Sequence, residues 1–306
     1  MPIGLNHAEI CAKFDRLVSD GIIAYQPSKP VLVADKGMMF CFHVVQSLKN
    51  KPQAEDTISV AKPTSTDSHF LSGTFGPGSD ILRDHPDVCI TKVNDTHYLV
   101  INKFPVLRPM LLLLTVDSYR RQHEPLDLED LDAGWQMMHA MEEEHYVFFN
   151  CTVTAGSSRA HKHLQVVPAP GHEGYPEGFR FFPDCPPGSD ARPPPLLYFI
   201  QRFDELSGGQ IKDSAQLLEI YSRLLQRARD ALQLPESEAA CPHNFAMTAR
   251  WMIVIPRSTK DIHGVTANTP GMLGSVYISN QEQLDEWKAF GPTNVLTALG
   301  LPAQNS

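Results

Sequence analysis

Residues 155–168 of this chain read AGSSRAHKHLQVVP and place His161, His163 and Gln165 at alternate positions directly after a Gly-Ser-Ser loop. In an extended strand, residues i, i+2 and i+4 point to the same face. The stretch therefore predicts a strand that presents three polar side chains to one ligand, while Leu164 and Val166 enter the core. Such an arrangement is typical of an active site.

The chemistry of this segment favours transfer of a phosphoryl or nucleotidyl group through a covalent histidine. A neutral imidazole has a free lone pair at neutral pH, because its ordinary pKa is about 6.5. A second imidazole two residues away can orient the first. The Gln165 carboxamide donates hydrogen bonds but no proton, which suits a leaving group as good as polyphosphate. Gly156, Ser157 and Ser158 offer N–H groups and hydroxyls for charge on phosphate oxygens.

A metal site formed by His161 and His163 is an alternative interpretation. Two imidazoles supply only half of a closed tetrahedral site, and no cysteine or acidic residue lies at a suitable spacing. The flanking Gly-Ser-Ser loop and Gln165 also argue against two unrelated surface histidines. We therefore predict a covalent role and no metal bound by these side chains.

The pattern resembles the histidine-triad superfamily in its His-x-His-x-Gln branch. That branch includes galactose-1-phosphate uridylyltransferases and the ATP adenylyltransferases, also called diadenosine tetraphosphate phosphorylases. The likeness is closer to the adenylyltransferases and runs from Ser47 to Pro302. Besides the motif it rests on three segments, which are Asn102–Val106, Phe149–Cys151 and Trp251–Arg257.

The resemblance implies a role for each residue of the motif and a wider set of substrate contacts. His163 is expected to be the nucleophile that takes the AMP group, His161 to orient or polarise it, and Gln165 to bind the α-phosphate. The resemblance places ten further residues at the substrate: Lys51, Asn102, Lys103, Asn150, Gly156, Ser157, Ser158, Asn268, Thr269 and Gly271. Asn102 could alternatively cap a turn.

Some positions depart from the family pattern or fall outside it. Met110 stands where relatives often have histidine, and Ser279 stands where a basic residue is expected, so the contacts to the distal phosphates do not follow from the resemblance. Arg257 could touch the substrate, but a surface ion pair is the favoured interpretation. The histidines without a flanking pattern are predicted to be structural or exposed, namely His7, His43, His97, His139 and His263.

Length and charge limit the classes of function. A chain of 306 residues can form one large or two modest domains. Its net charge of −9 argues against nucleic-acid and membrane-surface binding, which rely on a diffuse basic surface. No apolar run reaches the roughly 20 residues that cross a bilayer, and residues 1–19 do not resemble a signal peptide. The six cysteines show no C-x-x-C pattern, so we expect reduced thiols and a cytoplasmic location.

The apolar spacing predicts an α+β fold. Residues 98–101, 110–116 and 146–154 are typical of strands. Asp127 should cap a helix with a buried stripe, and a second helix should span residues 214–232; the stripes comprise Leu128, Leu131, Trp135 and Met138, then Leu217, Tyr221, Leu224 and Ala228. Residues 245–256 predict another strand pair. We expect a duplicated histidine-triad-like fold, an antiparallel sheet with packed helices.

The domain organisation follows from the prolines and from an internal echo. Nine prolines from Pro168 to Pro195 predict a long connection at 171–195. Residues 1–170 would be the catalytic half, and residues 196–306 an adenylyltransferase half that completes the substrate site. Residues 244–256 echo residues 97–115, but no His-x-His follows them.

The expected activity is phosphorolysis of diadenosine tetraphosphate to ATP and ADP through an adenylyl-histidine, with the reverse reaction joining ADP and ATP and releasing phosphate. Mg²⁺ is expected to accompany the nucleotide phosphates. The ligands are therefore a dinucleoside polyphosphate, ATP, ADP and phosphate, or sulfate in place of phosphate. Two alternatives stay open: a nucleotide-sugar phosphorylase or uridylyltransferase, and an inactive nucleotide-binding module. The sequence does not fix the oligomeric state.

Overall fold

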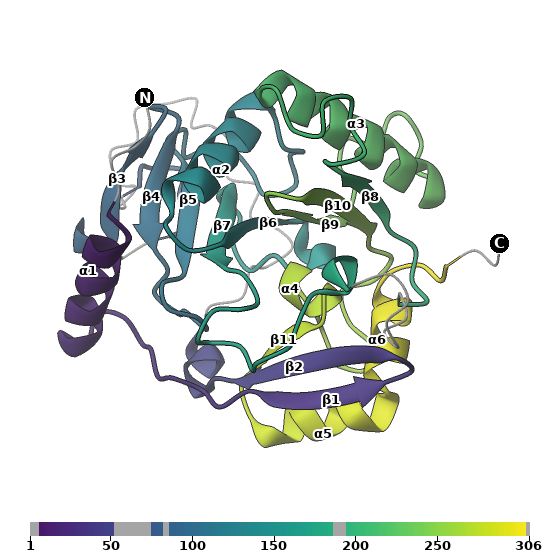
Figure 1. The fold of residues 1–306 in the computed structure, drawn as a ribbon, viewed down its shortest axis with the longest axis horizontal. Coiled ribbons are helices and arrows are strands. Elements are labelled where there is room, and N and C mark those ends of the chain that lie inside the picture. The colour runs from purple at the N-terminus through teal and green to yellow at the C-terminus, as the bar shows by residue number, and fades with distance from the viewer. Residues whose placement is uncertain (1–5, 52–74, 82–85, 186–193, 304–306) are drawn as a thin grey trace.

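The large antiparallel sheet is the centre of the fold (Figure 1). The computed structural model describes residues 6–51, 75–81, 86–185 and 194–303. Within them, the strands of the large sheet lie in the order β3-β4-β5-β7-β6-β9-β10-β8. In chain order they are β3 (Cys89–Val93), β4 (His97–Ile101), β5 (Leu111–Thr115), β6 (His145–Cys151), β7 (His163–Pro168), β8 (Phe199–Arg202), β9 (His243–Met247) and β10 (Trp251–Pro256).

Helices and a second, three-stranded sheet cover the two faces of the large sheet. The small sheet has the order β1-β2-β11, with β1 (Val31–Asp35), β2 (Met38–Val44) and β11 (Ser275–Ile278). The α-helices are α1 (His7–Ser19), α2 (Leu128–Ala140), α3 (Ser214–Ala231), α4 (Thr269–Met272), α5 (Gln281–Phe290) and α6 (Pro292–Leu299). Short 3₁₀ helices span Gln46–Asn50, Pro86–Val88, Val153–Ala155 and Phe182–Asp184.

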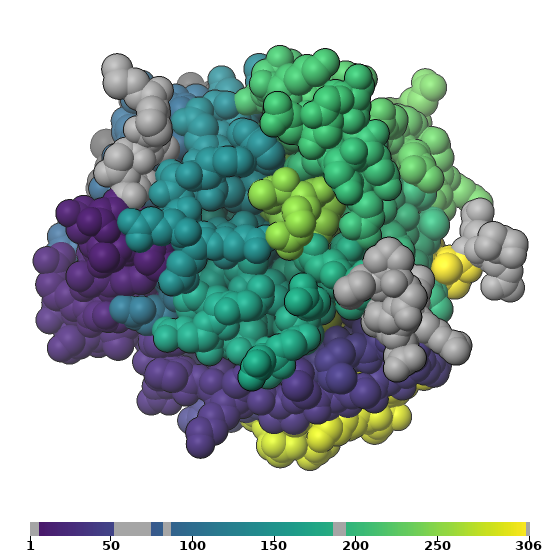
Figure 2. Space-filling model, viewed as in Figure 1, coloured from purple at the N-terminus to yellow at the C-terminus, as the bar shows by residue number. Residues whose placement is uncertain are grey.

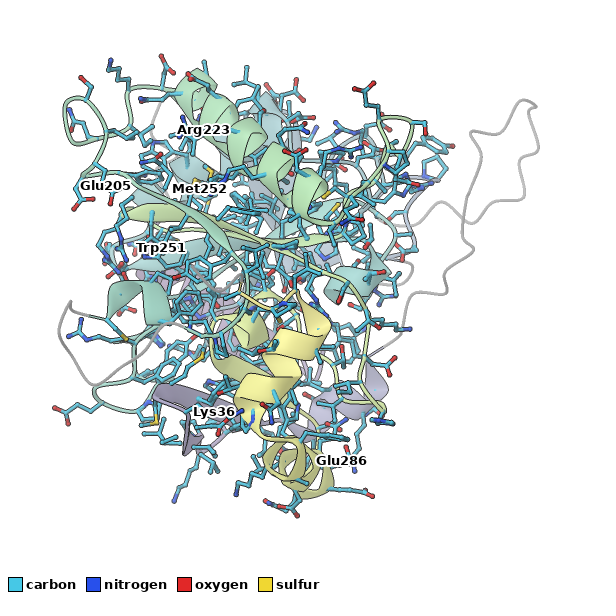
Figure 3. The ribbon with its side chains drawn as sticks, turned by 90° about the vertical axis from the view of Figure 1, so that its right-hand side faces the viewer. Lys36, Glu205, Arg223, Trp251, Met252 and Glu286 are labelled. Atoms are coloured by element: carbon cyan, nitrogen blue, oxygen red, sulfur yellow. The ribbon has the colours of Figure 1, made fainter. Side chains whose placement is uncertain are left out.

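The large sheet separates two hydrophobic cores. Helices α2 and α3 pack on one face, while the small sheet, α5 and α6 lie on the other (Figure 1). Neighbouring residues on a strand point to opposite faces, so Met252 belongs to the first core and Trp251 to the second (Figure 3). The strands β6, β7, β9 and β10 contribute buried residues to both cores, whereas the buried apolar residues of β4 and β5 belong to the first core.

The order of the strands shows a duplicated unit. The elements β5, α2, β6 and β7 follow one another in the first half, and β8, α3, β9 and β10 do so in the second. In the sheet they form mirrored triplets, β5-β7-β6 beside β9-β10-β8, joined by pairing of β6 with β9. The predicted α+β duplicated fold is confirmed. The predicted echo of residues 97–115 in 244–256 is wrong, because β9 and β10 occupy the place of β6 and β7.

The helix predictions are confirmed, except that Trp135 is only partly buried and Leu128 is exposed. Asp127 caps α2, accepting hydrogen bonds from Glu129 N and Asp130 N at 3.0 Å, and Leu131 and Met138 are buried. Leu128 was expected in the buried stripe, but it is 44% exposed. It occupies the first position of the helix. On α3, all four residues of the predicted stripe are buried.

Segments from the two ends of the chain pack together on the face of the large sheet opposite α2 and α3 (Figure 1). Figure 2 shows the purple β1 and β2 region against the yellow C-terminal helices. Thr293 N donates to Asp35 Oδ2 at 2.8 Å, which ties α6 to the end of β1. In the proline-rich stretch, described at 169–185 and 194–195, the structure has a single 3₁₀ helix. None of the described helices is long and apolar enough to cross a membrane.

Candidate active site

The motif lies at the start of β7, between β5 and β6. His163 is opposite Leu114 of β5, and Gln165 is opposite Phe148 of β6. Leu164 and Val166 are fully buried in the core that α2 and α3 cover. The alternation expected from the sequence therefore holds from His163 onward.

The His163 ring is held in one tautomer. Its Nδ1 lies 2.8 Å from the main-chain oxygen of His161. A carbonyl oxygen only accepts hydrogen bonds, so Nδ1 carries the proton and Nε2 keeps its lone pair. Burial lowers the His163 pKa to about 4, although the bond to the His161 carbonyl opposes the shift. The ring is therefore neutral at pH 7, with Nε2 as its nucleophilic atom.

The His161 ring is anchored inside the protein instead of facing a ligand. Its Nε2 lies 2.9 Å from the oxygen of Thr115, which makes Nε2 the donor, and its Nδ1 accepts from Ser79 Oγ at 2.8 Å. The ring is fully buried. The prediction of a shared face thus applies to His163 and Gln165 but not to His161, because β7 begins only at His163. What orients His163 is the main-chain carbonyl of His161.

Two adjoining cavities form a cleft beside His163. The smaller is lined by His163 and Gln165, and the larger extends to the loop before β11; they share Lys51, Phe104, Ser158 and Gln165. Most of the residues predicted at the substrate line this cleft, namely Lys51, Asn102, Lys103, Gly156, Ser157, Ser158, Asn268 and Gly271. The structure thus brings together positions more than 200 residues apart in the chain.

Positive charge is concentrated at the His163 end of the cleft. Lys51, Lys103 and Arg159 line the same cavity as His163. Burial and the charge of Arg159 lower the pKa of Lys51 to about 8. An anion in this cavity would relieve the repulsion between the cations. In a chain with a net charge of −9, this is a local site for phosphate oxygens.

Asn102 takes the turn-capping role and still reaches the cleft. Its Oδ1 accepts from Phe104 N at 3.0 Å, which fixes the turn after β4. The residue also lines the smaller cavity. The two interpretations offered by the sequence are therefore compatible.

Asn150 and Thr269 lie behind the cleft wall instead of lining it. Asn150 Oδ1 accepts from Thr269 N at 2.8 Å and from Asn244 Nδ2 at 2.9 Å. Thr269 Oγ1 lies 2.9 Å from the oxygen of Phe149. These buried bonds attach α4, and with it the loop that contains Asn268, to the central β6–β9 pair. Both residues hold the site together from the inside.

Arg257 belongs to this internal network, so the predicted surface ion pair is wrong. The residue is 1% exposed. Its Nη1 donates to Asn244 Oδ1 at 2.8 Å and to the oxygen of Ala267 at 2.7 Å, and its Nε donates to the oxygen of Leu299 at 3.1 Å. Burial lowers its pKa to about 9. Spacing along the chain did not indicate this role, because three of the four partners lie 10 to 42 residues away, and only the oxygen of Thr259 is close in the sequence.

The two loops that line the cleft touch at Gly156. Its φ is +89°, and a Cβ there would lie 2.8 Å from the oxygen of Ala267. Only glycine combines this backbone conformation with such a close approach. Asn268, which follows Ala267, caps α4, because its Oδ1 accepts a hydrogen bond from Gly271 N at 3.2 Å. The Gly-Ser-Ser loop and the Asn268 loop are therefore in direct contact and form one continuous wall of the cleft.

The two departures from the family pattern lie in the larger cavity. Met110 and Ser279 both line it. The Ser279 hydroxyl lies 3.0 Å from Gln283 Oε1. Lys260, which was not predicted, lines the same cavity and supplies a cation from a different loop.

Sequence reasoning also missed Arg159, although the residue lies inside the motif. Its position between Ser158 and His161 was the available signal, since a cation in an anion-binding loop serves the same ligand. Lys260 had no comparable signal. Among the described residues, no group of three or more His, Cys, Asp or Glu side chains could hold a metal ion.

Two family models of known proteins together match most of the chain, including the segments that form the cleft. The family model for the Ap4A phosphorylase N-terminal domain matches residues 8–177, which is more than half of the chain. The chain belongs to the Ap4A phosphorylase family. The family's second part, the ATP adenylyltransferase C-terminal domain, matches residues 193–302. The resemblance inferred from the motif is therefore confirmed, and Ap4A denotes diadenosine tetraphosphate.

Relatives in this family come from Saccharomyces cerevisiae. The chain is 30% identical to Protein APA1 over 213 residues, and 29% identical to diadenosine 5',5'''-P1,P4-tetraphosphate phosphorylase 2 over 215 residues. The alignments cover 62% and 61% of this chain, and 63% of each relative. The matched part is thus just under two thirds of the relatives' length.

Solved structures of the family share the fold. Yeast Ap4A phosphorylase Apa2 superposes with a TM-score of 0.73 at 22% identity, covering 98% of this chain and 95% of that one. Its complex with AMP gives 0.72 at 22% identity and its complex with Ap4A gives 0.72 at 21%, each covering 98% of this chain and respectively 97% and 98% of the other. The likeness extends over both halves of the chain.

Proposed function

We propose that this protein is a nucleotidyltransferase that phosphorolyses diadenosine tetraphosphate to ATP and ADP. The reverse reaction joins ADP and ATP and releases phosphate. The carrying observation is the fixed tautomer of His163, whose Nδ1 faces the His161 carbonyl at 2.8 Å and whose Nε2 is free to attack. Family membership and the named substrates of the yeast relatives support the choice of substrate.

In the first displacement, His163 Nε2 attacks the α-phosphorus. A P–N bond forms, the bond from phosphorus to the bridging oxygen breaks, and ATP leaves. Gln165 would hold an α-phosphate oxygen, while Lys51, Lys103 and Arg159 face the polyphosphate. ATP is a good leaving group, so no general acid is required at this step.

In the second displacement, a phosphate oxygen attacks the adenylyl-histidine. The P–N bond breaks, ADP leaves, and Nε2 regains its lone pair. The loops of Gly156, Ser157 and Asn268 would surround the nucleotide during both steps. Sulfate has a similar size and charge, and would give adenylyl sulfate. The scheme requires ping-pong kinetics.

Mg²⁺ is proposed to arrive with the substrate, because it binds few protein ligands and prefers phosphate oxygens. Removing it with a chelator should slow turnover, and added Mg²⁺ should restore it. We also propose a cytoplasmic location. All six cysteines are free thiols, as is usual in a reducing compartment.

The deciding experiment uses the His163→Ala variant and labelled diadenosine tetraphosphate. Without phosphate, the natural protein should accumulate an adenylyl group on His163, detected by mass spectrometry, and release one ATP per site. The variant should form no adduct and lose at least about 10⁴-fold in turnover. His139→Ala, an exposed histidine on α2, is the matched control and should keep full activity. Normal turnover by a folded His163→Ala variant would refute the mechanism.

The same assay separates the alternative activities. Diadenosine tetraphosphate, UDP-glucose and GDP-sugars are each incubated with and without phosphate. Faster phosphorolysis of a nucleotide sugar would replace the proposed substrate. Binding of AMP without any adduct would identify an inactive nucleotide-binding module.

A further inference from the structure

Gln122 holds both peptide groups that flank the His163 α-carbon. Its Oε1 accepts from His163 N at 2.8 Å, and its Nε2 donates to the oxygen of His163 at 3.0 Å. Nε2 also donates to the oxygen of Asn150 at 3.2 Å. The side chain is 4% exposed. The Gln122 carboxamide therefore makes three hydrogen bonds, two to His163 on β7 and one to Asn150 on β6.

Gln122 occupies a place where the sheet itself is interrupted. The β6–β7 ladder runs from His145 opposite Pro168 to Phe148 opposite Gln165, and stops there. Continued by two more residues, it would have paired Asn150 with His163. The Gln122 carboxamide, which has the same donor and acceptor as a peptide group, bridges these two residues instead. It replaces the missing step of the ladder.

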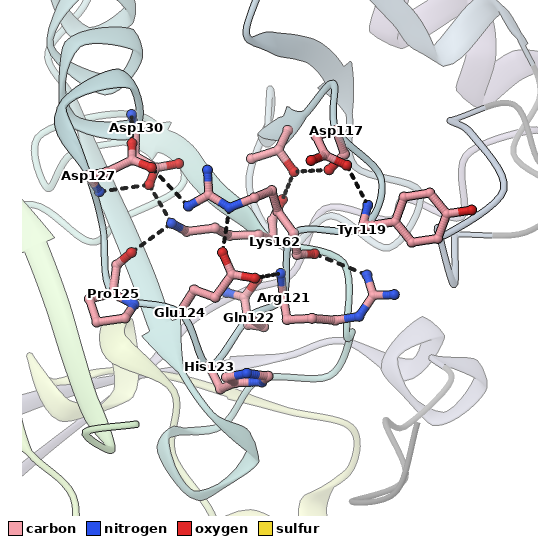
Figure 4. A network of polar contacts seen from close by, with 12 residues as sticks. Asp117, Tyr119, Arg121, Gln122, His123, Glu124, Pro125, Asp127, Asp130 and Lys162 are labelled. Carbon is pink, nitrogen blue, oxygen red and sulfur yellow. Dashed lines mark hydrogen bonds and ion pairs between the residues drawn. The ribbon is translucent and has the colours of Figure 1, made fainter. Parts of the chain in front are cut away.

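The main chain of Gln122 is itself fixed between the same two segments. Its N–H donates to the oxygen of Ala160 at 2.9 Å, and its oxygen accepts from Thr152 N at 3.3 Å. The neighbouring Arg121 forms an isolated bridge with His161. Figure 4 shows Gln122 in the segment that passes beside Lys162. A side chain anchored in this way can transmit a fixed position to His163.

We propose that Gln122 is a positioning residue for the nucleophile, and the proposal rests on the proposed function of His163. Gln122 lines neither of the two cavities that form the cleft. It sets the main chain of His163, and the His161 carbonyl then sets the ring, so Nε2 faces phosphorus without reorganisation. A displacement of about 1 Å from the line of attack costs on the order of 10²-fold in rate.

The test compares Gln122→Met with the natural protein. Methionine has a similar size but none of the three hydrogen bonds. The rate of adenylyl-His163 formation, measured in a single turnover without phosphate, should fall about 100-fold. The dissociation constant of the substrate should change less than about threefold, because Gln122 does not contact the ligand. Gln136→Met is the matched control, since among the described residues the Gln136 side chain bonds Asp132 of its own helix and no residue of the cleft, and it should leave both values unchanged.

Gln122→Glu supplies a pH readout that general destabilisation would not produce. A carboxylate at this position would face two carbonyl oxygens and repel them. Lowering the pH protonates it and restores a donor, so the adenylylation rate should rise several-fold between pH 7.5 and 5.5, while that of the natural protein does not rise. This variant also decides the question if Gln122→Met does not fold. A rate loss that is independent of pH, or one explained by weaker substrate binding alone, would overturn the proposal.

A measurement on the free enzyme distinguishes failure of the Gln122 proposal from failure of the proposed function. If the natural protein forms no adduct, Gln122 is tested on the free enzyme by ¹⁵N NMR of the His163 ring, assigned with His163→Ala. The natural protein should show a protonated Nδ1 and an unprotonated Nε2, and Gln122→Met should mix the two tautomers and speed exchange of the Nδ1 proton. An unchanged ring in Gln122→Met would refute the positioning role whatever the substrate is.

Discussion

At the scale of single residues, the cleft places a neutral nucleophile beside positively charged side chains. Burial keeps His163 neutral at physiological pH, while burial and the nearby charge of Arg159 lower the pKa of Lys51 to about 8. Substrate phosphates would neutralise both cations. The same residues therefore predict a dependence of binding on pH.

Lys51 should control the alkaline limb of substrate binding. Lysine is charged below its pKa and neutral above it, so KM for the dinucleotide should rise as the pH passes about 8. Lys51→Gln should raise KM by about 10- to 100-fold at pH 7, as expected for loss of a charge-assisted bond of roughly 1.5–3 kcal/mol. It should also abolish the alkaline rise. Lys51→Arg, which stays charged, should keep KM low up to pH 9. Initial-rate kinetics from pH 6.5 to 9 test this, and an alkaline rise that persists in Lys51→Gln would exclude Lys51.

At the scale of elements, β7 connects the cleft to helix α2. Gln165 on β7 faces the cleft, while the side chain of Lys162, the residue directly before β7, reaches the start of α2 (Figure 4). There its Nζ lies 2.6 Å from Asp130 Oδ2 and donates to the oxygen of Pro125 at 2.7 Å. His97 Nε2 lies 3.0 Å from Asp130 Oδ1. Burial opposes the charge of Asp130, but the His97 bond and Lys162 outweigh it and hold the Asp130 pKa well below its usual range.

Breaking this buried pair should destabilise the protein much more than breaking an exposed one. Lys162→Met leaves a buried carboxylate without its cation and should cost roughly 3–5 kcal/mol in the free energy of unfolding. The double variant Lys162→Met with Asp130→Asn should recover part of this loss, since the remaining partner is neutral. Asp15→Asn, which breaks the exposed pair with Arg108, should cost at most about 1 kcal/mol. Urea denaturation measures all three, and equal losses for the two single variants would contradict the argument.

At the scale of the whole molecule, the duplicated halves share one sheet and the cleft draws on both. The domain boundary at residues 171–195 stays a prediction. In the structure the two halves are joined by direct pairing of β6 with β9. A consequence of this large interior is that many histidines are buried. Burial lowers the pKa of each of the following to about 4: His43, His145, His161, His163 and His243.

These histidines should make stability fall in mild acid. An unfolded histidine takes up a proton near pH 6.5, but the folded one does so only near pH 4, so the folded state loses relative stability as the pH drops through this window. At pH 5 the loss should be roughly 2 kcal/mol for each such histidine. Denaturant unfolding at pH 7 and pH 5 measures the total. His43→Phe keeps a ring between Tyr175 and Tyr277 and should reduce the pH dependence, whereas His139→Gln serves as the exposed control. Equal stability at both pH values would show that the buried rings titrate normally.

Sequence alone determined what depends on near neighbours. The strand that carries His163 and Gln165, the cap at Asp127 and the stripe on α3 follow from spacing and local hydrogen bonds, and the motif itself identified the family. Only the tertiary structure decided the roles of Gln122, Asn150 and Arg257, and that the His161 ring points inward. Their partners lie between 13 and 119 residues away for most of these contacts, so they become neighbours only when β9 pairs with β6 and the segment before α2 passes beside β7. Spacing along a chain carries no information about which distant carbonyl a buried donor will meet.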